Sequence, residues 1–171
     1  QNRIDAGYHL GLYSTERVIE KSGIPSVKLG SLVKSPMFTA QRGKRVYVEN
    51  GVKFLSTTDI SKSNVLGIEK YLSRRTDGLQ TLMVEKDWIL VSRSGQEILG
   101  STFMVDDTYS DCAVNEHALR VIVDDKKISP NYVFGFLSSM FGKQYIRAGI
   151  FGSAILTINE DILSKINIPL L

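Results

Sequence analysis

The sequence predicts an α+β domain in which a strongly curved, mainly antiparallel β body carries helices packed on it. Two observations predict this class. Before residue 124, short β-leaning runs alternate with Gly, Ser, Pro and Asn, which is typical of strands joined by turns. After Ser129, apolar residues recur every three or four positions, which is the spacing of an amphipathic helix. No internal repeat or linker interrupts the 171 residues, so we expect one domain over residues 1–171.

One short helix and six strands are expected before residue 129. The helix is predicted over residues 15–22, because a hydroxyl residue is available as its N-cap and Gly23 can end it. A turn at Gly95 is expected to join the fourth and fifth strands. The strands are predicted over residues 27–29, 45–48, 52–55, 88–95, 98–105 and 118–123.

The last third of the chain is predicted to be helical. Ser129 and Pro130 form a helix start, with Ser as N-cap and Pro at the first helical position. An apolar stripe from Tyr132 to Tyr145 follows, and we interpret it as core. Further on we expect a turn over residues 149–153, a short strand over 154–158 and a final short helix that starts at Asn159-Glu160-Asp161.

Composition is that of an ordinary globular protein, with 43% hydrophobic and 23% charged residues. No apolar run approaches the roughly 18 residues that would indicate a membrane span. The single cysteine, Cys112, forms no internal disulfide and offers no metal-ligand spacing, so a reducing cytoplasm is the expected location. The first residues show neither an initiator Met nor a signal-peptide pattern, and we expect a segment of a longer polypeptide.

Charge is unevenly distributed along the chain, although the net charge is only +3. Between Gln41 and Arg75 lie eight basic and three acidic residues, and residues 126–154 contain four basic and no acidic ones. Residues 106–125 reverse this pattern, with six acids and one Arg. The pattern predicts a basic side that could face a polyanion, while an unevenly charged solvated surface remains the alternative.

A search for catalytic chemistry finds little. The sequence contains no phosphate-binding glycine loop and no cofactor glycine loop of a methyltransferase. His9 and His117 could each act as a general base in a hydrolase, but a lone His is more often structural. The acidic pairs at 106–107 and 124–125 could hold a cation, although such pairs are usually solvated turn residues. We therefore expect no catalytic residue, no metal site and no cofactor bound by this chain.

Several polar turns instead carry side chains suited to reading DNA. Arg can address guanine and Gln can address adenine with two hydrogen bonds each, while Lys suits phosphates, which set register. Each turn alone could be an ordinary solvated surface, so the hypothesis requires that the turns converge on one face. The candidate DNA-binding residues are Gln41, Arg42, Lys44, Arg45, Tyr47, Thr57, Thr58, Lys62, Arg74, Arg75, Arg93, Ser94, Gln96, Lys143, Arg147 and Ser153.

We expect different contacts from different members of this set. Base or phosphate contacts are expected from Arg42, Arg45 and Arg93, and base contacts from Gln41 and Gln96. The residues expected to bind phosphates are Lys44, Lys62, Arg74, Arg75, Lys143 and Arg147.

Five motifs, in this order, resemble the target-recognition domains of type I restriction–modification specificity subunits. They are Arg3-Ile4-Asp5-Ala6-Gly7-Tyr8, the glycine-strand-Asp-Ile element of residues 51–60, the Asp-apolar-Ser-x-x-Gly hairpin of residues 86–95 with Gly100, the Ile-x-Pro-x-Tyr helix start of residues 128–133, and the closing segment of residues 159–169. Each motif consists mainly of glycines and apolar residues, which many protein families share. The order of all five motifs along the chain is what distinguishes this family.

The resemblance implies a DNA-binding domain that reads one half of a bipartite target. A complete subunit of this family carries two such domains separated by spacer helices, whereas this chain contains one domain and ends at residues 168–171, where a spacer helix would begin. The implied partners are double-stranded DNA, methyltransferase subunits and a translocating restriction subunit. S-adenosylmethionine, ATP and Mg are implied only on those partner subunits. Two alternatives stay open: a recognition domain within a fused restriction–methyltransferase chain, and a protein-interaction domain that docks to a larger enzyme with little DNA contact.

Overall fold

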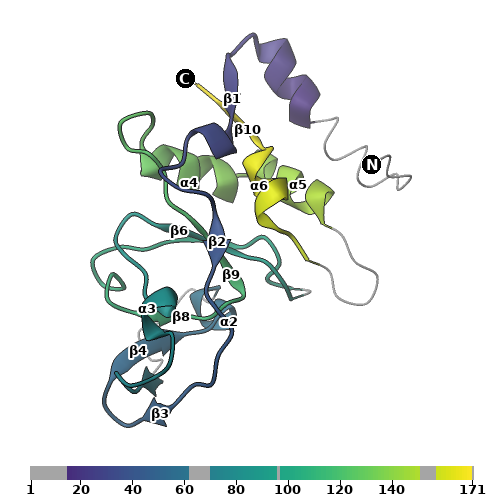
Figure 1. The fold of residues 1–171 in the computed structure, drawn as a ribbon. Coiled ribbons are helices and arrows are strands. Elements are labelled where there is room, and N and C mark those ends of the chain that lie inside the picture. The colour runs from purple at the N-terminus through teal and green to yellow at the C-terminus, as the bar shows by residue number, and fades with distance from the viewer. Residues whose placement is uncertain (1–14, 62–69, 96, 151–156, 171) are drawn as a thin grey trace.

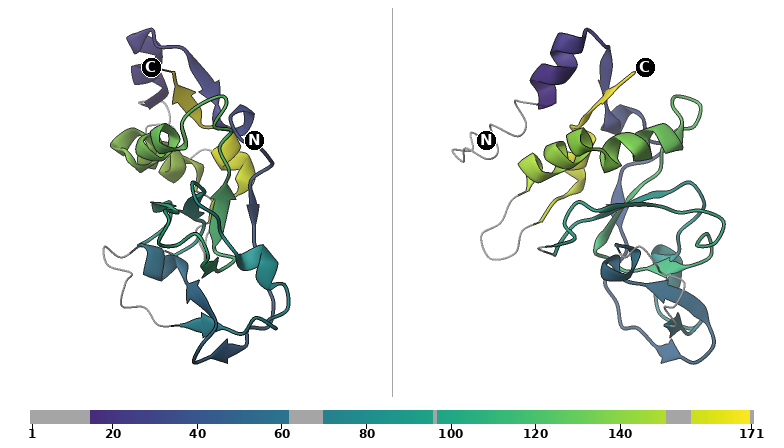
Figure 2. Two further views of the ribbon diagram at one scale, coloured as in Figure 1. Left: turned by 90° about the vertical axis from the view of Figure 1, so that its left-hand side faces the viewer. Right: turned by 180° about the vertical axis from the view of Figure 1, so that it is seen from behind.

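A computed structural model describes residues 15–61, 70–95, 97–150 and 157–170 of the chain. Its elements form an elongated molecule with a helical layer at one end, a central sheet and a distal sheet at the other end (Figure 1). Two further views show the same order of layers (Figure 2). The fold is the predicted α+β class, with the longer helices on one side of a mainly antiparallel β body.

The central sheet has four antiparallel strands in the order β2-β9-β6-β7. Three of them confirm predicted strands, each shorter than predicted, and the fourth, β2, has too few residues to leave a pattern in the sequence. The strands are β2 (Phe38–Thr39), β9 (Ala118–Val121), β6 (Ile89–Ser92) and β7 (Thr102–Met104). Between β6 and β7 the backbone turns through Gly95 and Gly100, both with positive φ, as the predicted turn at Gly95 requires.

The distal sheet also has four strands, in the order β3-β5-β4-β8. Its strands are β3 (Tyr47–Val48), β5 (Tyr71–Leu72), β4 (Val52–Leu55) and β8 (Ala113–Val114). The strand predicted over residues 52–55 is confirmed in full, and β4 pairs antiparallel with β5 but parallel with β8. Two one-turn helices pack beside the sheet, α2 (Thr57–Ile60) and α3 (Leu79–Leu82). We call β3, β4, β5, β8, α2 and α3 the distal unit.

The helical layer is built around a two-stranded sheet of β1 (Ser26–Lys28) and β10 (Asn167–Pro169). Residues 15–22 are helical and end at Gly23 with φ +68°, which confirms the predicted helix and its stop. The remaining elements of the layer are the 3-10 helix η1 (Leu29–Ser31), α4 (Pro130–Ser138), α5 (Met140–Gly149) and α6 (Glu160–Ser164). The helix starts predicted at Ser129-Pro130 and at Asn159 are both confirmed, and Asn159 accepts a hydrogen bond from the Ile162 amide.

The long apolar stripe does not form one helix but two. Ser139 is extended at the break, and its hydroxyl accepts a hydrogen bond from the Gly142 amide to cap α5. A Cβ at Gly142 would lie 2.2 Å from the carbonyl oxygen of Phe136, so only glycine permits this close turn. The prediction that the stripe is core holds in part: Val133, Leu137 and Tyr145 are buried, whereas Met140 and Phe141, just after the break, are 67% and 37% exposed.

Three apolar clusters of the described residues fill the space between the layers. The largest lies between the helices and the central sheet and includes Val91, Leu119 and Leu137. A second lies on the opposite side of the central sheet and contains Leu55, Leu90 and Val114, while a third lies inside the distal unit. Alternate residues of β6 and β9 therefore point to opposite sides of the central sheet, as the period of a strand requires. No helix of the described residues is long and apolar enough to cross a membrane.

Candidate nucleic-acid interface

Four side chains from three separate loops form a contact network between the central sheet and the distal unit, with a hydrogen bond at each of its two ends. Arg45, in the loop before β3, donates to the Glu116 carboxylate. Beside it, the His117 Nε2 atom lies 3.9 Å from the other Glu116 oxygen. The His117 Nδ1 atom lies 3.0 Å from the hydroxyl oxygen of Ser94, just after β6. This network, which we call the loop network, joins two of the turns that the sequence predicts to read DNA.

The predicted loop at residues 41–46 also lies against the turn at residues 73–78. The amide of Ser73 donates to the Val46 carbonyl oxygen at 2.8 Å. A Cβ at Gly43 would lie 3.7 Å from the carbonyl oxygen of Asp77. Both segments carry exposed side chains from the candidate set, namely Gln41, Arg42, Lys44, Arg74 and Arg75.

At the other end of the loop network, the segment after β6 meets the helical layer. The Ile158 amide donates to the Arg93 carbonyl oxygen at 3.0 Å, and Ser94 forms a β-bridge with Thr157. Nearby, Ile146 of α5 fills the space above Gly100, where a Cβ would meet it at 2.5 Å. Lys143 and Arg147 are exposed on α5, and Arg93 is partly exposed. These contacts link the candidate segments one to the next, from the distal unit to α5.

Cations on these segments are free of ion pairs among the described residues. Ion pairs in that part of the chain involve other lysines, Arg45 and His117, and none of them involves the remaining candidate cations. These cations are Arg93, which is partly exposed, and the exposed Arg42, Lys44, Arg74, Arg75, Lys143 and Arg147. An unpaired exposed cation can release a counterion on meeting a phosphate without first breaking an internal bond.

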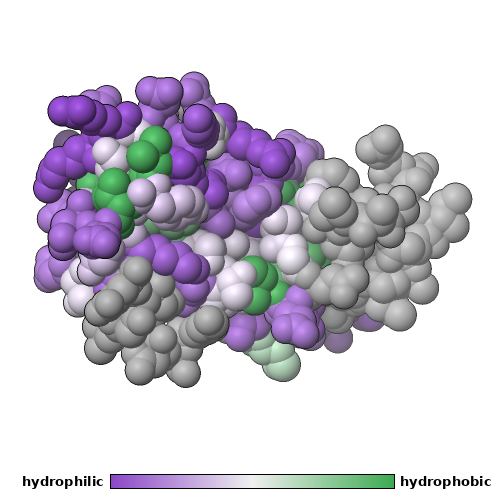
Figure 3. Space-filling model, turned by 90° about the horizontal axis from the view of Figure 1, so that it is seen from below, coloured by the Kyte–Doolittle hydropathy of each residue, from purple (hydrophilic) through white to green (hydrophobic). Residues whose placement is uncertain are grey.

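The distal end also exposes apolar surface beside the basic loop. Val46 is 45% exposed, Tyr47 is 56% exposed and Val48 is 36% exposed. Viewed from this end, the surface is largely hydrophilic with small apolar patches (Figure 3). Tyr47 packs its ring edge-on against Phe54, with centroids 6.0 Å apart, so its position is fixed although its surface is open.

Of the candidate residues, Thr57 is buried and Arg45 is only partly exposed and held by other side chains. Thr57 is only 4% exposed, because it begins α2 on the face that packs against the core, whereas Thr58 beside it is exposed. Arg45 has a side chain 23% exposed, pairs with Glu116 and lies 4.9 Å above the Phe54 ring. We therefore take Arg45 to position the loop and leave Thr57 out of the interface. Lys62, Gln96 and Ser153 lie outside the described residues.

The helix start at α2 illustrates how this loop region is stabilised. Ser56 and Asp59 form a capping box, in which the Ser56 hydroxyl accepts from the Asp59 amide and Asp59 accepts from the Ser56 amide. Burial alone would raise the pKa of Asp59, but hydrogen bonds from Ser56 and the charge of Lys70 outweigh it and lower that pKa. The buried carboxylate is therefore kept ionised and rigid next to β4.

Glu116 was missed by the sequence reasoning, and His117 was considered there only as a general base. Nothing local marks Glu116, because its partner Arg45 lies 71 positions away. In the structure His117 contacts the Ser94 hydroxyl, but the carboxylate beside it is already engaged by Arg45. His9 lies outside the described residues, so the hydrolase hypothesis remains untested.

Three of the four acids considered as cation ligands lie beside lysines, and the fourth, Asp106, accepts a hydrogen bond from the Thr108 amide. Asp107 binds Lys86, Asp125 binds Lys34 and Asp124 lies 3.5 Å from Lys127. The Lys34 amine holds the pKa of Asp125 below its usual value through a hydrogen bond and its charge. Within the described ranges, no three His, Cys, Asp or Glu side chains are grouped so that they could hold a metal ion.

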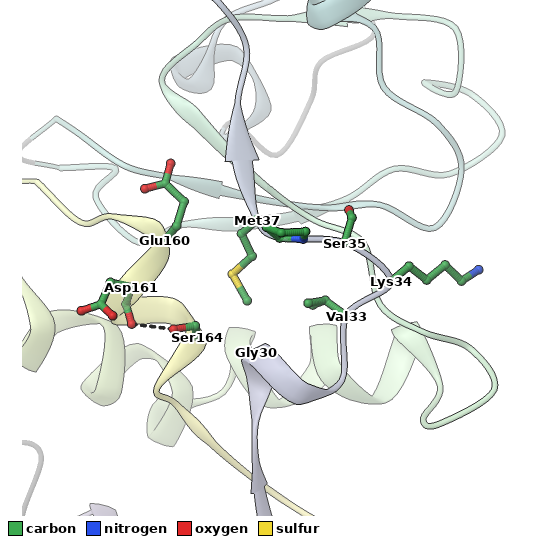
Figure 4. A pocket seen from close by; sticks show the side chains of 9 residues that line it. Gly30, Val33, Lys34, Ser35, Met37, Glu160, Asp161 and Ser164 are labelled. Atoms are coloured by element: carbon green, nitrogen blue, oxygen red, sulfur yellow. Dashed lines mark hydrogen bonds between the residues drawn. The ribbon is translucent and has the colours of Figure 1, made fainter.

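Two hollows lie in the helical layer, away from the loop network. One, of about 570 Å³, lies between the helix of residues 15–22 and α4 and is lined mainly by apolar side chains such as Ile19, Tyr132 and Phe136. The other, of about 510 Å³, lies between η1 and α6, where Met37 and Val33 point inward and Glu160 stands on the α6 side (Figure 4). Lys34 points away from this second hollow, so it offers no cluster of cations to an anion.

One family profile matches nearly the whole chain. Residues 22–170 match the sequence profile described as the type I restriction modification DNA specificity domain. A search of curated protein sequences found no match.

Solved structures with the same fold come from the same class of protein. The S subunit of the type I restriction–modification system from M. genitalium superposes with a TM-score of 0.57 at 17% identity, over 85% of this chain and 34% of that one. The HsdS subunit of Thermoanaerobacter tengcongensis superposes with a TM-score of 0.57 at 14% identity, over 95% of this chain and 40% of that one.

A third structure superposes with a TM-score of 0.52 at 14% identity, over 95% of this chain and 41% of that one. It comes from work on the complex assembly and conformational transition of the type I R-M system. The chain therefore spans between a third and about two fifths of the length of these solved chains. Because the family profile covers nearly all of the chain, from residue 22 to residue 170, this protein belongs to the type I restriction modification DNA specificity domain family.

Proposed function

We propose that this domain reads one half of a bipartite DNA target within a specificity subunit and directs partner methyltransferase and restriction subunits to it. The observation that carries the proposal is the loop network, which ties the loops of Arg45 and Ser94 together through the Glu116–His117 turn. Unpaired exposed cations lie on both sides of this network. A duplex has regularly spaced phosphates, and a basic surface with connected loops suits it.

Different parts of this surface have different roles. Arg93 adjoins Ser94 in the middle of the linked segments, and we assign it together with Arg42 and Gln41 to base edges in the major groove. Phosphates are assigned to the outer cations, which are Lys44, Arg74, Arg75, Lys143 and Arg147. Tyr47 and Thr58 are exposed beside them and complete the surface.

Catalysis and its cofactors belong to the partner subunits in this proposal. Methyl transfer from S-adenosylmethionine and ATP- and Mg-dependent translocation and cleavage take place there, in the cytoplasm, and this chain supplies only recognition. We assign the helical end to partner contact, because Val18 and Phe141 are exposed beside its apolar hollow at 49% and 37%. This hollow belongs to the helical layer, whereas the loops that carry Arg42, Lys44, Arg74 and Arg75 belong to the distal part of the molecule; Figure 1 shows these two parts at opposite ends.

The first test is DNA binding by single variants measured against salt. A target would be selected from randomised duplexes, and affinity for target and random duplexes would be measured from low to high KCl. Arg93→Ala should weaken target binding by about 1–3 kcal/mol and loosen the preference at one base position. Lys44→Ala should weaken all duplexes alike and reduce the salt slope by about one.

The control is Lys165→Ala, which removes an exposed cation that directly follows α6 in the helical layer and is paired with Asp161. It should change neither affinity nor slope. Equal behaviour of Arg93→Ala and Lys44→Ala on target and random duplexes would refute the assigned roles. Salt-independent association with a methyltransferase, without any duplex binding, would replace DNA reading by the protein-interaction alternative.

A further inference from the structure

Arg120 is the largest fully buried side chain of the described residues, and neither the DNA contacts nor the apolar core accounts for it. It lies in the middle of β9, where its Cα partners are Phe38 on β2 and Leu90 on β6. Its neighbours Leu119 and Val121 belong to the apolar cluster on the helical side of the sheet. By strand alternation Arg120 points to the other side, toward the distal unit.

Among the residues that the structure describes, the guanidinium binds backbone carbonyl oxygens and no carboxylate. Its Nη1 atom donates to the Ala118 carbonyl at 3.0 Å. Its Nη2 atom donates to the carbonyl oxygens of Val114 at 2.8 Å and Leu82 at 3.3 Å. Leu82 is the last residue of α3 and Val114 is the last residue of β8. Arg120 therefore donates hydrogen bonds to the carbonyl groups at one helix end and one strand end of the distal unit.

Two of these carbonyl groups flank the turn at the centre of the loop network. Val114 directly precedes residues 115–117, and Ala118 directly follows them. Within this turn, Glu116 binds Arg45 and His117 contacts Ser94. Arg120 therefore holds both ends of the turn from inside the protein, beneath the side chains that connect the candidate DNA-reading loops.

A buried cation of this kind is costly. Burial lowers the pKa of Arg120 to about 10, although the charge of Glu116 acts in the opposite direction. The Nε atom is buried and has no hydrogen-bond partner among the described residues. An apolar side chain of similar volume would avoid the cost of desolvating a charge. Arg120 instead contributes hydrogen bonds of fixed direction, because its planar guanidinium holds carbonyl groups of both the central sheet and the distal unit.

We propose that Arg120 is a positioning residue that sets the 115–117 turn, and through it the spacing between the Arg45 loop and the Ser94 segment. The part of this inference that concerns target preference rests on the proposed DNA-reading function. The part that concerns the turn does not, because it is a statement about the free protein. An experiment can therefore address the two parts separately.

The test compares Arg120→Met, which keeps the volume but loses the donors, with Arg120→Lys, which keeps the charge but loses the fork. Amide hydrogen exchange of the DNA-free protein is followed at Arg93, Asn115 and Ala118, whose amides are bonded in or around the turn. Exchange at these amides should speed up in both variants, more in Arg120→Met. Exchange within α4 should stay as in the parent protein, because α4 packs on the opposite side of the central sheet.

Binding is then measured on target and random duplexes. We expect the ratio of target to random affinity to fall about tenfold in Arg120→Met, comparable to one mismatched base pair, with random affinity unchanged. The control for general destabilisation is Leu137→Ala, a cavity in α4 that should lower the unfolding midpoint and leave the ratio intact.

Each outcome decides the inference. Unchanged exchange in the turn overturns it, whatever the DNA data show. Faster exchange with an unchanged affinity ratio overturns the specificity role and leaves Arg120 as a structural residue only. Absence of DNA binding by the parent protein would refute the proposed function, while exchange would still report on the turn. If Arg120→Met does not fold, Arg120→Lys is judged by the same two measurements.

Discussion

The Arg45–Glu116 pair predicts that a single charge removal changes stability and DNA binding in opposite directions. In Glu116→Gln the acceptor geometry is retained but the negative charge is lost. The side chains of Arg45 and Glu116 are 23% and 15% exposed, so this ion pair is neither fully exposed nor fully buried. Exposed ion pairs contribute up to about 1 kcal/mol, and breaking a buried one costs about 3–5 kcal/mol. We therefore expect a loss of about 2 kcal/mol in the free energy of unfolding, or about 6 °C in Tm for a domain of this size.

DNA binding should respond in the other direction. With Glu116 neutral, Arg45 is freed to meet a phosphate, and one negative charge is removed from a surface that faces a polyanion. The salt slope should become steeper by about 0.9, and affinity at low salt should rise for target and random duplexes alike. Urea unfolding gives the stability, and titration of labelled duplexes at several KCl concentrations gives the slope.

The control for charge alone is Glu85→Gln, since Glu85 is exposed and lies outside the loop network. It should leave stability unchanged within about 0.5 kcal/mol. A double-mutant cycle with Arg45→Gln should show a coupling of similar size to the single loss. The reasoning is refuted if Glu116→Gln is as stable as the parent and Arg45→Gln flattens the salt slope, because Arg45 would then bind phosphate rather than position its loop.

Three further predictions concern the scaffold. Asp59→Asn should lower the free energy of unfolding by about 1 kcal/mol, because it weakens the α2 capping box. Ser56 and Lys70 lower the pKa of Asp59, so the parent should lose this stability as the pH falls from about 4. The variant should lack that acid-dependent loss in denaturant titrations from pH 7 to pH 2. Gly100→Ala should cost about 2 kcal/mol or more, since φ is +78° and the new Cβ would meet Ile146 at 2.5 Å, and calorimetry should show a lower Tm, whereas an unchanged Tm would contradict the packing of α5 on this turn. Cys112 is buried and burial raises the pKa of its thiol, so a thiol reagent should react at the rate of opening or unfolding; rapid reaction in buffer would show that this core is open.

Much of the fold could be predicted because it is encoded locally. The helix of residues 15–22 ends at a glycine with positive φ, and β4 occupies the predicted residues 52–55. Ser129-Pro130 and Asn159 mark helix starts through capping, which depends on a few neighbouring residues. These signals survive folding because the groups that satisfy each other are close in the chain.

Other features depended on residues distant in sequence. The break at Ser139 requires Gly142 to fit against the Phe136 carbonyl, and the stripe on either side of the break keeps the same helical period. β8 has only two residues, and its parallel pairing with β4 follows from the course of the intervening chain. The sequence pattern could not predict these features, because the period of the apolar residues indicates which side of an element is buried but not which other segment packs against that side.

For the candidate site, the sequence by itself determined which residue types stand in the polar turns and that they are rich in Arg, Lys, Gln and Ser. Only the tertiary structure decided which of them act together. In the folded protein Thr57 is buried, Arg45 pairs with Glu116 across 71 positions, and the buried Arg120 binds the carbonyl groups on either side of the turn that carries Glu116. The physical reason is that the sequence shows an arginine in the same way whether it is exposed, paired or buried. Its role depends on whether folding places solvent, a carboxylate or carbonyl groups beside it.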